Sequence, residues 1–129
     1  MGILRRLCRL NEGIRVRGVV SRKQIIAEGV LVSDGTEQTV IEVSGLMNLE
    51  GYIDLSNMES GDVVALSRYV KIQPDGEYKL HAREVYSGSQ PEPLIRFPFI
   101  AGYYGIKITL QQTSGTLYKE FPYQFFKET

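Results

Sequence analysis

The fold is decided by residues 63–86, VVALSRYVKIQPDGEYKLHAREVY. Apolar and polar side chains alternate with a period of two on both sides of the turn at residues 74–76, which predicts two antiparallel strands. Gly76 suits the left-handed position of a three-residue hairpin loop with a bulge. Pairing Gln73 with Glu77 brings the apolar residues of both strands onto one face. A slip of one residue would turn one strand over, so this register is the expected one.

The apolar face of the hairpin also carries two charges. The register makes Arg68 and Glu84 diagonal neighbours, within reach of each other's side chains. Because an unpaired charge on a buried face is costly, we expect the two to form an ion pair. The alternative is a hollow interior, in which Arg68, Glu84, Tyr78 and Tyr86 line a ligand cavity.

Turn signals recur outward from this hairpin. They stand at Asp34-Gly35, Ser60-Gly61, Ser87-Gly88 and Ser114-Gly115, with short apolar runs between them. Short strands at such spacing are typical of all-β domains. The sequence therefore predicts an antiparallel β-sandwich or a closed small barrel of about eight or nine strands. Residues 13–129 are expected to form this single β domain, preceded by a short amphipathic helix.

A second hairpin is predicted at Ser114-Gly115. Pairing Thr113 with Thr116 places Ile108 opposite Phe121 and Ile106 opposite Tyr123. Since Pro122 cannot donate a ladder hydrogen bond, the last strand is expected at a sheet edge or a bulge. An edge that carries aromatic side chains needs a cover, such as a second subunit or the N-terminal helix. The aromatic residues of this expected edge are Phe121, Tyr123, Phe125 and Phe126.

The N-terminal segment differs from the rest of the chain in period and in charge. Apolar residues at positions 3, 4, 7, 8 and 10 have helical spacing, which predicts a basic amphipathic helix or arm over residues 1–12. Residues 14–20 return to a period of two and predict a strand. Residues 1–23 carry seven basic side chains and one acidic, whereas the remaining chain carries eight basic and fourteen acidic. This asymmetry indicates a basic arm on an acidic body, despite a net charge of zero.

The composition argues against most catalytic and metal chemistry. The 129 residues include one histidine, His81, and one cysteine, Cys8, so a zinc cluster and an internal disulfide are not expected. No phosphate-binding loop and no nucleophile–base pattern are recognisable. We therefore predict no catalytic residues, no metal and no cofactor. The sequence shows no signal peptide and no transmembrane segment, so a cytoplasmic or intracellular setting is expected.

Three functional hypotheses follow, and the first is a non-enzymatic subunit that assembles with other protein chains, expected as a homo-oligomer. It would use the N-terminal arm, the aromatic edge and the tyrosines of the segment around Pro98 and Gly102, where aromatics near Gly and Pro form an exposed platform. Its partner-binding residues would be Arg5, Arg6, Arg9, Tyr103, Tyr104, Phe121, Tyr123, Phe125 and Phe126.

The second hypothesis comes from a resemblance. Residues 17–20 (RGVV), 32–36 (VSDGT) and 61–64 (GDVV), followed by the hairpin, resemble OB-like barrels over a little over half of the chain. The resemblance implies nucleic-acid binding through a basic stripe, with Tyr69 and His81 stacking on bases. The stripe would consist of Arg15, Arg17, Arg22 and Lys23. The third hypothesis is a ligand-binding barrel or barrel enzyme that uses the cavity around Arg68 and Glu84.

Overall fold

The structure is a computed structural model, and it describes residues 22–128. These residues form eight strands joined by turns and short loops. The strands are β1 (Lys23–Val32), β2 (Gln38–Val43), β3 (Asn48–Asp54), β4 (Val63–Lys71), β5 (Lys79–Ser87), β6 (Leu94–Ala101), β7 (Gly105–Ser114) and β8 (Glu120–Glu128).

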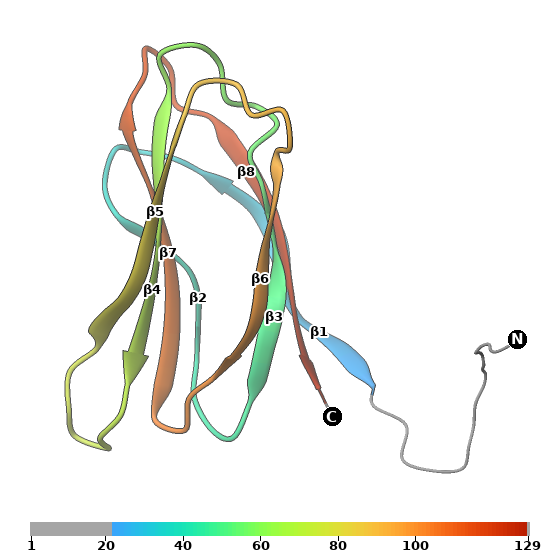
Figure 1. Cartoon of the computed structure of the whole chain (residues 1–129), viewed down its shortest axis with the longest axis vertical. Coiled ribbons are helices and arrows are strands. Elements are labelled where there is room, and N and C mark those ends of the chain that lie inside the picture. Colours follow the sequence, from blue (N-terminus) through green and yellow to red (C-terminus); the bar gives the residue numbers. More distant parts are fainter. Residues whose placement is uncertain (1–21, 129) are drawn as a thin grey trace, which may run out of the picture.

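The strands pack as two four-stranded sheets, in the orders β1-β8-β3-β6 and β2-β7-β4-β5 (Figure 1). All of the pairings are antiparallel. β4 pairs with β5, β3 with β6, β2 with β7 and β1 with β8. Each strand of the first half of the chain therefore pairs with its counterpart in the second half, counted outward from the β4–β5 hairpin. This is the jelly-roll arrangement of a β-sandwich. The sandwich prediction is confirmed, and the closed barrel, including its OB-like form, is wrong.

The core lies between the two sheets, where alternate residues of each strand point inward. In β7, for example, Ile106, Ile108 and Leu110 are fully buried. Three phenylalanines from the other sheet meet them, and the rings of Phe97 and Phe125 lie 5.8 Å apart between centroids. Burial of such side chains is the main favourable term in folding. The third of these phenylalanines is Phe121, and all three are at most 1% exposed.

The first hairpin confirms the predicted register over most of its length. Leu66 pairs with Glu84, and Arg68 pairs with Ala82, as the sequence predicts. Beyond Arg68 the register shifts by one residue, so that Tyr69 pairs with Leu80 rather than with His81. The extra residue is a β-bulge, which the alternation pattern does not reveal.

The second predicted hairpin is wrong, because β7 and β8 lie in different sheets. β8 is flanked by β1 and β3, so it is not an edge, and the rings of Phe121 and Phe125 belong to the core. Pro122 is tolerated there because pairing with β3 begins only at Tyr123, leaving Pro122 opposite Val30 of β1. The predicted aromatic edge therefore does not exist in this form.

Buried polar groups explain why the chain crosses between the sheets after β7. The amide of Gln112 donates to the carbonyl of Leu117, at 2.9 Å, inside the turn. The backbone N–H of Lys119 donates to the hydroxyl of Ser33, at 3.0 Å, at the end of β1. Ser33 and Gln112 also hydrogen-bond each other, and both are almost fully buried. These bonds direct the chain onto β1 instead of back along β7.

The predictions for the N-terminal segment fall outside the described residues. The predicted helix over residues 1–12 and the strand over 14–20 lie there, together with Arg5, Arg6, Arg9, Arg15 and Arg17. Residues 22–128 contain no helix that is long and apolar enough to cross a membrane. β1 begins at Lys23, at the same end of the sandwich as the β6–β7 loop (Figure 1).

Candidate functional site

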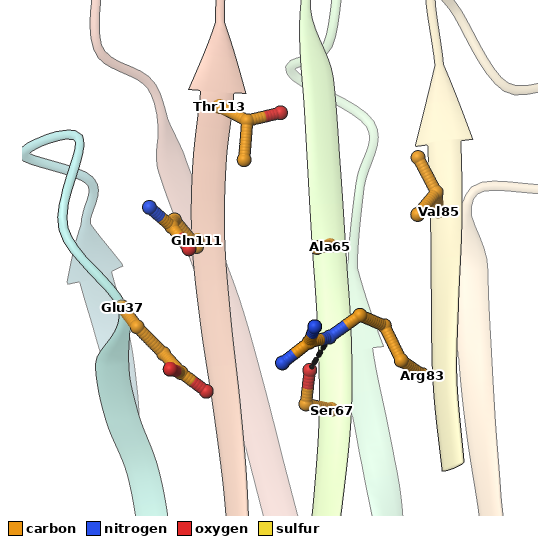
Figure 2. Close-up of a pocket in the computed structure, with 7 residues that line it drawn as sticks. All are labelled: Glu37, Ala65, Ser67, Arg83, Val85, Gln111 and Thr113. Carbon is orange, nitrogen blue, oxygen red and sulfur yellow. Dashed lines mark hydrogen bonds between the residues drawn. The ribbon is translucent and has the colours of Figure 1, made fainter.

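A shallow depression of about 240 Å³ lies on the outer face of the β2-β7-β4-β5 sheet. Figure 2 shows Arg83 reaching from β5 across β4, toward Glu37 on the far side of β7. The side chains of Ala65 and Ser67 on β4 are small, so the long side chain of Arg83 can lie over this strand. The lining residues are Glu37, Ala65, Ser67, Arg83, Val85, Gln111 and Thr113.

Hydrogen bonds connect the polar groups of this depression. The carboxylate of Glu37 accepts from the hydroxyl of Thr109, at 2.6 Å, and from the hydroxyl of Tyr69. These bonds, with weaker contributions from Arg83 and Lys107, hold the pKa of Glu37 below its ordinary value. Arg83 donates to the hydroxyls of Ser67, at 2.8 Å, and Tyr69, at 3.2 Å. The network therefore fixes a carboxylate and a guanidinium on one sheet face.

This network places no base beside the Ser67 hydroxyl. The hydroxyl of Ser67 faces a guanidinium group, which cannot take its proton, so a nucleophile–base pair is lacking here. His81 is exposed on β5 and lies with Val70 and Leu80 beside a different hollow. Within residues 22–128, no group of three or more His, Cys, Asp or Glu side chains could hold a metal ion.

The larger hollow is a groove of about 630 Å³ on the outer face of the other sheet. It crosses all four strands, from Val30 on β1 through Pro122 on β8 and Tyr52 on β3 to Leu94 on β6. Val30 and Leu94 are 55% and 56% exposed. We call this hollow the outer groove. It is lined by Glu28, Gly29, Val30, Tyr52, Asp54, Leu94, Pro122, Tyr123 and Gln124.

The charged groups that line the outer groove are all acidic. The carboxylate of Glu28 accepts a hydrogen bond from the amide of Gln124, at 2.9 Å. The carboxylate of Asp54 accepts from the backbone N–H of Ser56, also at 2.9 Å. Neither carboxylate forms an ion pair with another residue of the described part of the chain. The outer groove therefore combines the apolar side chains of Val30, Pro122 and Leu94 with two carboxylates that form no ion pair within residues 22–128.

A separate charge cluster lies on the same face, next to the outer groove. The ammonium group of Lys23 lies 2.6 Å from the carboxylate of Glu50, which also contacts Arg96 at 3.6 Å. Lys23 lies over the ring of Phe99 as well, 4.4 Å from its centroid. Phe126 lines a small hollow in this cluster. Lys23, predicted as part of a basic stripe, is thus paired with Glu50.

The predicted cavity residues do not meet around one hollow. Arg68 and Glu84 form the predicted ion pair, with 3.8 Å between Nη2 and Oε1, and Arg68 also contacts the ring of Phe97 in the core. Tyr86 packs against the core and donates a hydrogen bond to Glu84, at 3.4 Å, whereas Tyr78 lies apart from them in the β4–β5 loop.

The outward position of Tyr78 follows from its contacts. Its hydroxyl donates to Glu42, at 2.9 Å, and its ring lies beneath the ammonium groups of Lys71 and Lys107. Burial and the carboxylate of Glu42 raise the pKa of Tyr78 to about 12. Tyr78 is therefore a fixed surface residue and does not line a cavity.

The other predicted binding residues are scattered. Tyr69 and His81 are not paired across the hairpin, because the register shift places Tyr69 opposite Leu80. The Tyr69 hydroxyl binds Glu37 and Arg83 instead. Tyr103 and Tyr104 are both exposed in the β6–β7 loop, with ring centroids 4.8 Å apart in an edge-to-face contact. Of the basic stripe, only Arg22 and Lys23 fall within residues 22–128, and Arg22 is exposed.

Neither the role of Glu37 in the network nor the outer groove was predicted from the sequence. Glu37 is 72 residues from Thr109 and 32 from Tyr69, so no local pattern links them. The groove joins four strands that are distant in sequence. One local signal was available, because Val30 and Val32 alternate with inward residues of β1 and so had to face outward.

Comparison of the chain with protein-family models, with curated proteins and with solved structures finds no significant match. The class of protein is therefore defined by the fold alone, as an eight-stranded jelly-roll sandwich.

Proposed function

We propose that this protein is a non-enzymatic subunit that assembles with further copies of itself. The observation that supports the proposal best is the outer groove, an exposed and partly apolar hollow that crosses all four strands of one sheet. Exposed apolar surface of this kind is typical of protein interaction sites. The exposed side chains of Val30, Val32 and Leu94 lie on this face.

The fold is compatible with this function but does not decide it. Jelly rolls include capsid, lectin and cupin domains, so a likeness at the level of architecture supports several functions. Assembly is favoured over the others by the chemistry of the described residues. The network of Glu37, Tyr69 and Arg83 lacks a nucleophile–base pair. The outer groove is open and offers exposed apolar side chains rather than a closed pocket.

Light scattering coupled to size-exclusion chromatography tests the proposal on the full chain. We expect a mass that is a multiple of the 14.6 kDa subunit and that rises with protein concentration. A strictly monomeric mass over the whole accessible concentration range would refute assembly.

Nucleic-acid binding by the basic arm is the competing function. It predicts that a labelled oligonucleotide binds the full chain and that affinity falls steeply as salt rises, because phosphate contacts release counterions. Assembly through the outer groove predicts an oligomeric mass in the absence of nucleic acid. Measuring both quantities in the same salt series separates the two functions.

A further inference from the structure

The outer groove has the shape and charge to receive a short basic amphipathic segment. We propose that it binds residues 3–10 of a second copy of the chain. The inference rests on the assembly proposed above and names the contact that produces it.

The apolar parts of the two partners match in size. The groove runs from β1 to β6 over three strand spacings, or about 14 Å. Residues 3–10, if helical as their spacing predicts, form a helix about 12 Å long. Its apolar stripe consists of Ile3, Leu4, Leu7 and Leu10. One such helix would cover the exposed side chains of Val30 and Leu94 together.

The charges of the two partners are complementary. The segment carries Arg5, Arg6 and Arg9, with no acidic residue between positions 3 and 10. The groove presents the carboxylates of Glu28 and Asp54, which form no ion pair with other described residues. Charged hydrogen bonds between guanidinium and carboxylate groups are strong and can be bidentate.

Chain direction favours a second copy over the same copy. The arm joins β1 at Lys23, seven residues before Val30, which is about 23 Å along an extended strand. Residues 14–20 are predicted to be extended as well, and seven extended residues span a further 23 Å or so. If that run continues the direction of β1, it leads away from the groove of its own sheet. On such a path residues 3–10 would reach the groove of a neighbouring copy.

Cysteine crosslinking of the full chain tests this contact, since Cys8 is the only cysteine and lies within the segment. In Val30→Cys, mild oxidation should yield disulfide-linked dimers and larger species on a non-reducing gel. Mass spectrometry should identify peptides that link position 8 to position 30. The species should disappear when Cys8→Ser is added.

Val85→Cys is the matched control, because Val85 is a valine of similar exposure, 61%, on the outer face of the other sheet. It should crosslink several-fold less than Val30→Cys. Equal crosslinking of the two variants would overturn the proposal. A link between positions 8 and 30 within one monomer would overturn it too, since the segment would then cover its own sheet.

The remaining outcomes separate the contact from the assembly. An oligomeric mass without the position 8 to position 30 link would overturn the contact while assembly stands. A monomeric mass at all concentrations would overturn the assembly as well. Salt-sensitive oligonucleotide binding that is lost in an Arg5→Ala, Arg6→Ala, Arg9→Ala variant, with no link formed, would assign the segment to nucleic acid and overturn the proposal.

Discussion

At the scale of single residues, Gly51 is the glycine of the β1-β8-β3-β6 sheet that has the least room for a side chain. A Cβ atom at this glycine would lie 2.4 Å from the carbonyl oxygen of Gln124 and 2.4 Å from the ring of Phe125. Both neighbours are fixed, one by the β3–β8 ladder and the other by the core. Gly51 on β3 is therefore what allows Phe125 to enter the core from β8.

We predict that Gly51→Ala lowers the free energy of unfolding by about 1–3 kcal/mol, because overpacking forces the backbone or the ring to move. Urea denaturation measures the change. Gly76→Ala is the control, since a Cβ atom there would come no closer than 3.1 Å to another atom, the Cβ of Gln73, and the contact lies in the β4–β5 loop and not inside a sheet. A Gly51→Ala variant as stable as the control would contradict this packing.

Glu37 gives a prediction about pH. Hydrogen bonds from Thr109 and Tyr69 hold the pKa of the folded carboxyl below its ordinary value of 4.5. A carboxyl whose pKa is lowered on folding contributes stability above the unfolded value, and the contribution is lost as pH falls through the folded pKa. At neutral pH, Glu37→Gln should therefore unfold more easily than the natural chain.

The difference should shrink as pH falls below 4.5, where the Glu37 carboxylate becomes protonated. Denaturation across a pH series measures it, with Glu77→Gln in the exposed β4–β5 loop as the control. A difference that does not change with pH would show that Glu37 acts through its shape and not through its charge.

At the scale of elements, strand pairing could be predicted from the sequence only where two strands that are consecutive in the chain are also neighbours in a sheet. β4 and β5 are the only described strands that are both consecutive in the chain and neighbours in a sheet. Their register could be predicted because it is local, and the prediction failed only beyond the bulge after Arg68. The partners of β8 are β1 and β3, far away in sequence. Alternation shows which residues face inward, but it carries no information about which strand lies alongside.

Two adjacent phenylalanines of β8 face opposite sides of the sheet, because successive side chains of a strand alternate. Phe125 is fully buried in the core, whereas Phe126 faces outward beside the Lys23–Glu50 cluster. We predict that Phe125→Ala lowers the free energy of unfolding by about 3–5 kcal/mol and that Phe126→Ala costs much less. Urea denaturation of both variants measures the contrast. Similar losses for the two would contradict the burial of Phe125 in the core and the outward position of Phe126.

At the scale of the whole molecule, the two sheets present unlike outer faces. One carries the network of Glu37, Tyr69 and Arg83, whose polar groups already bind one another. The other carries the outer groove, where Val30 and Leu94 are exposed and the carboxylates of Glu28 and Asp54 form no ion pair with another described residue. A surface that satisfies itself gains little from a partner, because binding would replace one set of hydrogen bonds with another. The groove side is therefore the face on which we propose that association occurs.

If copies associate through the outer groove, stability depends on protein concentration, because association stabilises the folded state by mass action. We predict that the Tm of the full chain rises with concentration in calorimetry. Val30→Lys should remove most of this rise, since a lysine there breaks the apolar surface and neutralises the carboxylates that attract a basic segment. Val85→Lys should leave the rise intact. A Tm that stays constant with concentration, or an equal response of both variants, would mean that the copies do not meet at the groove.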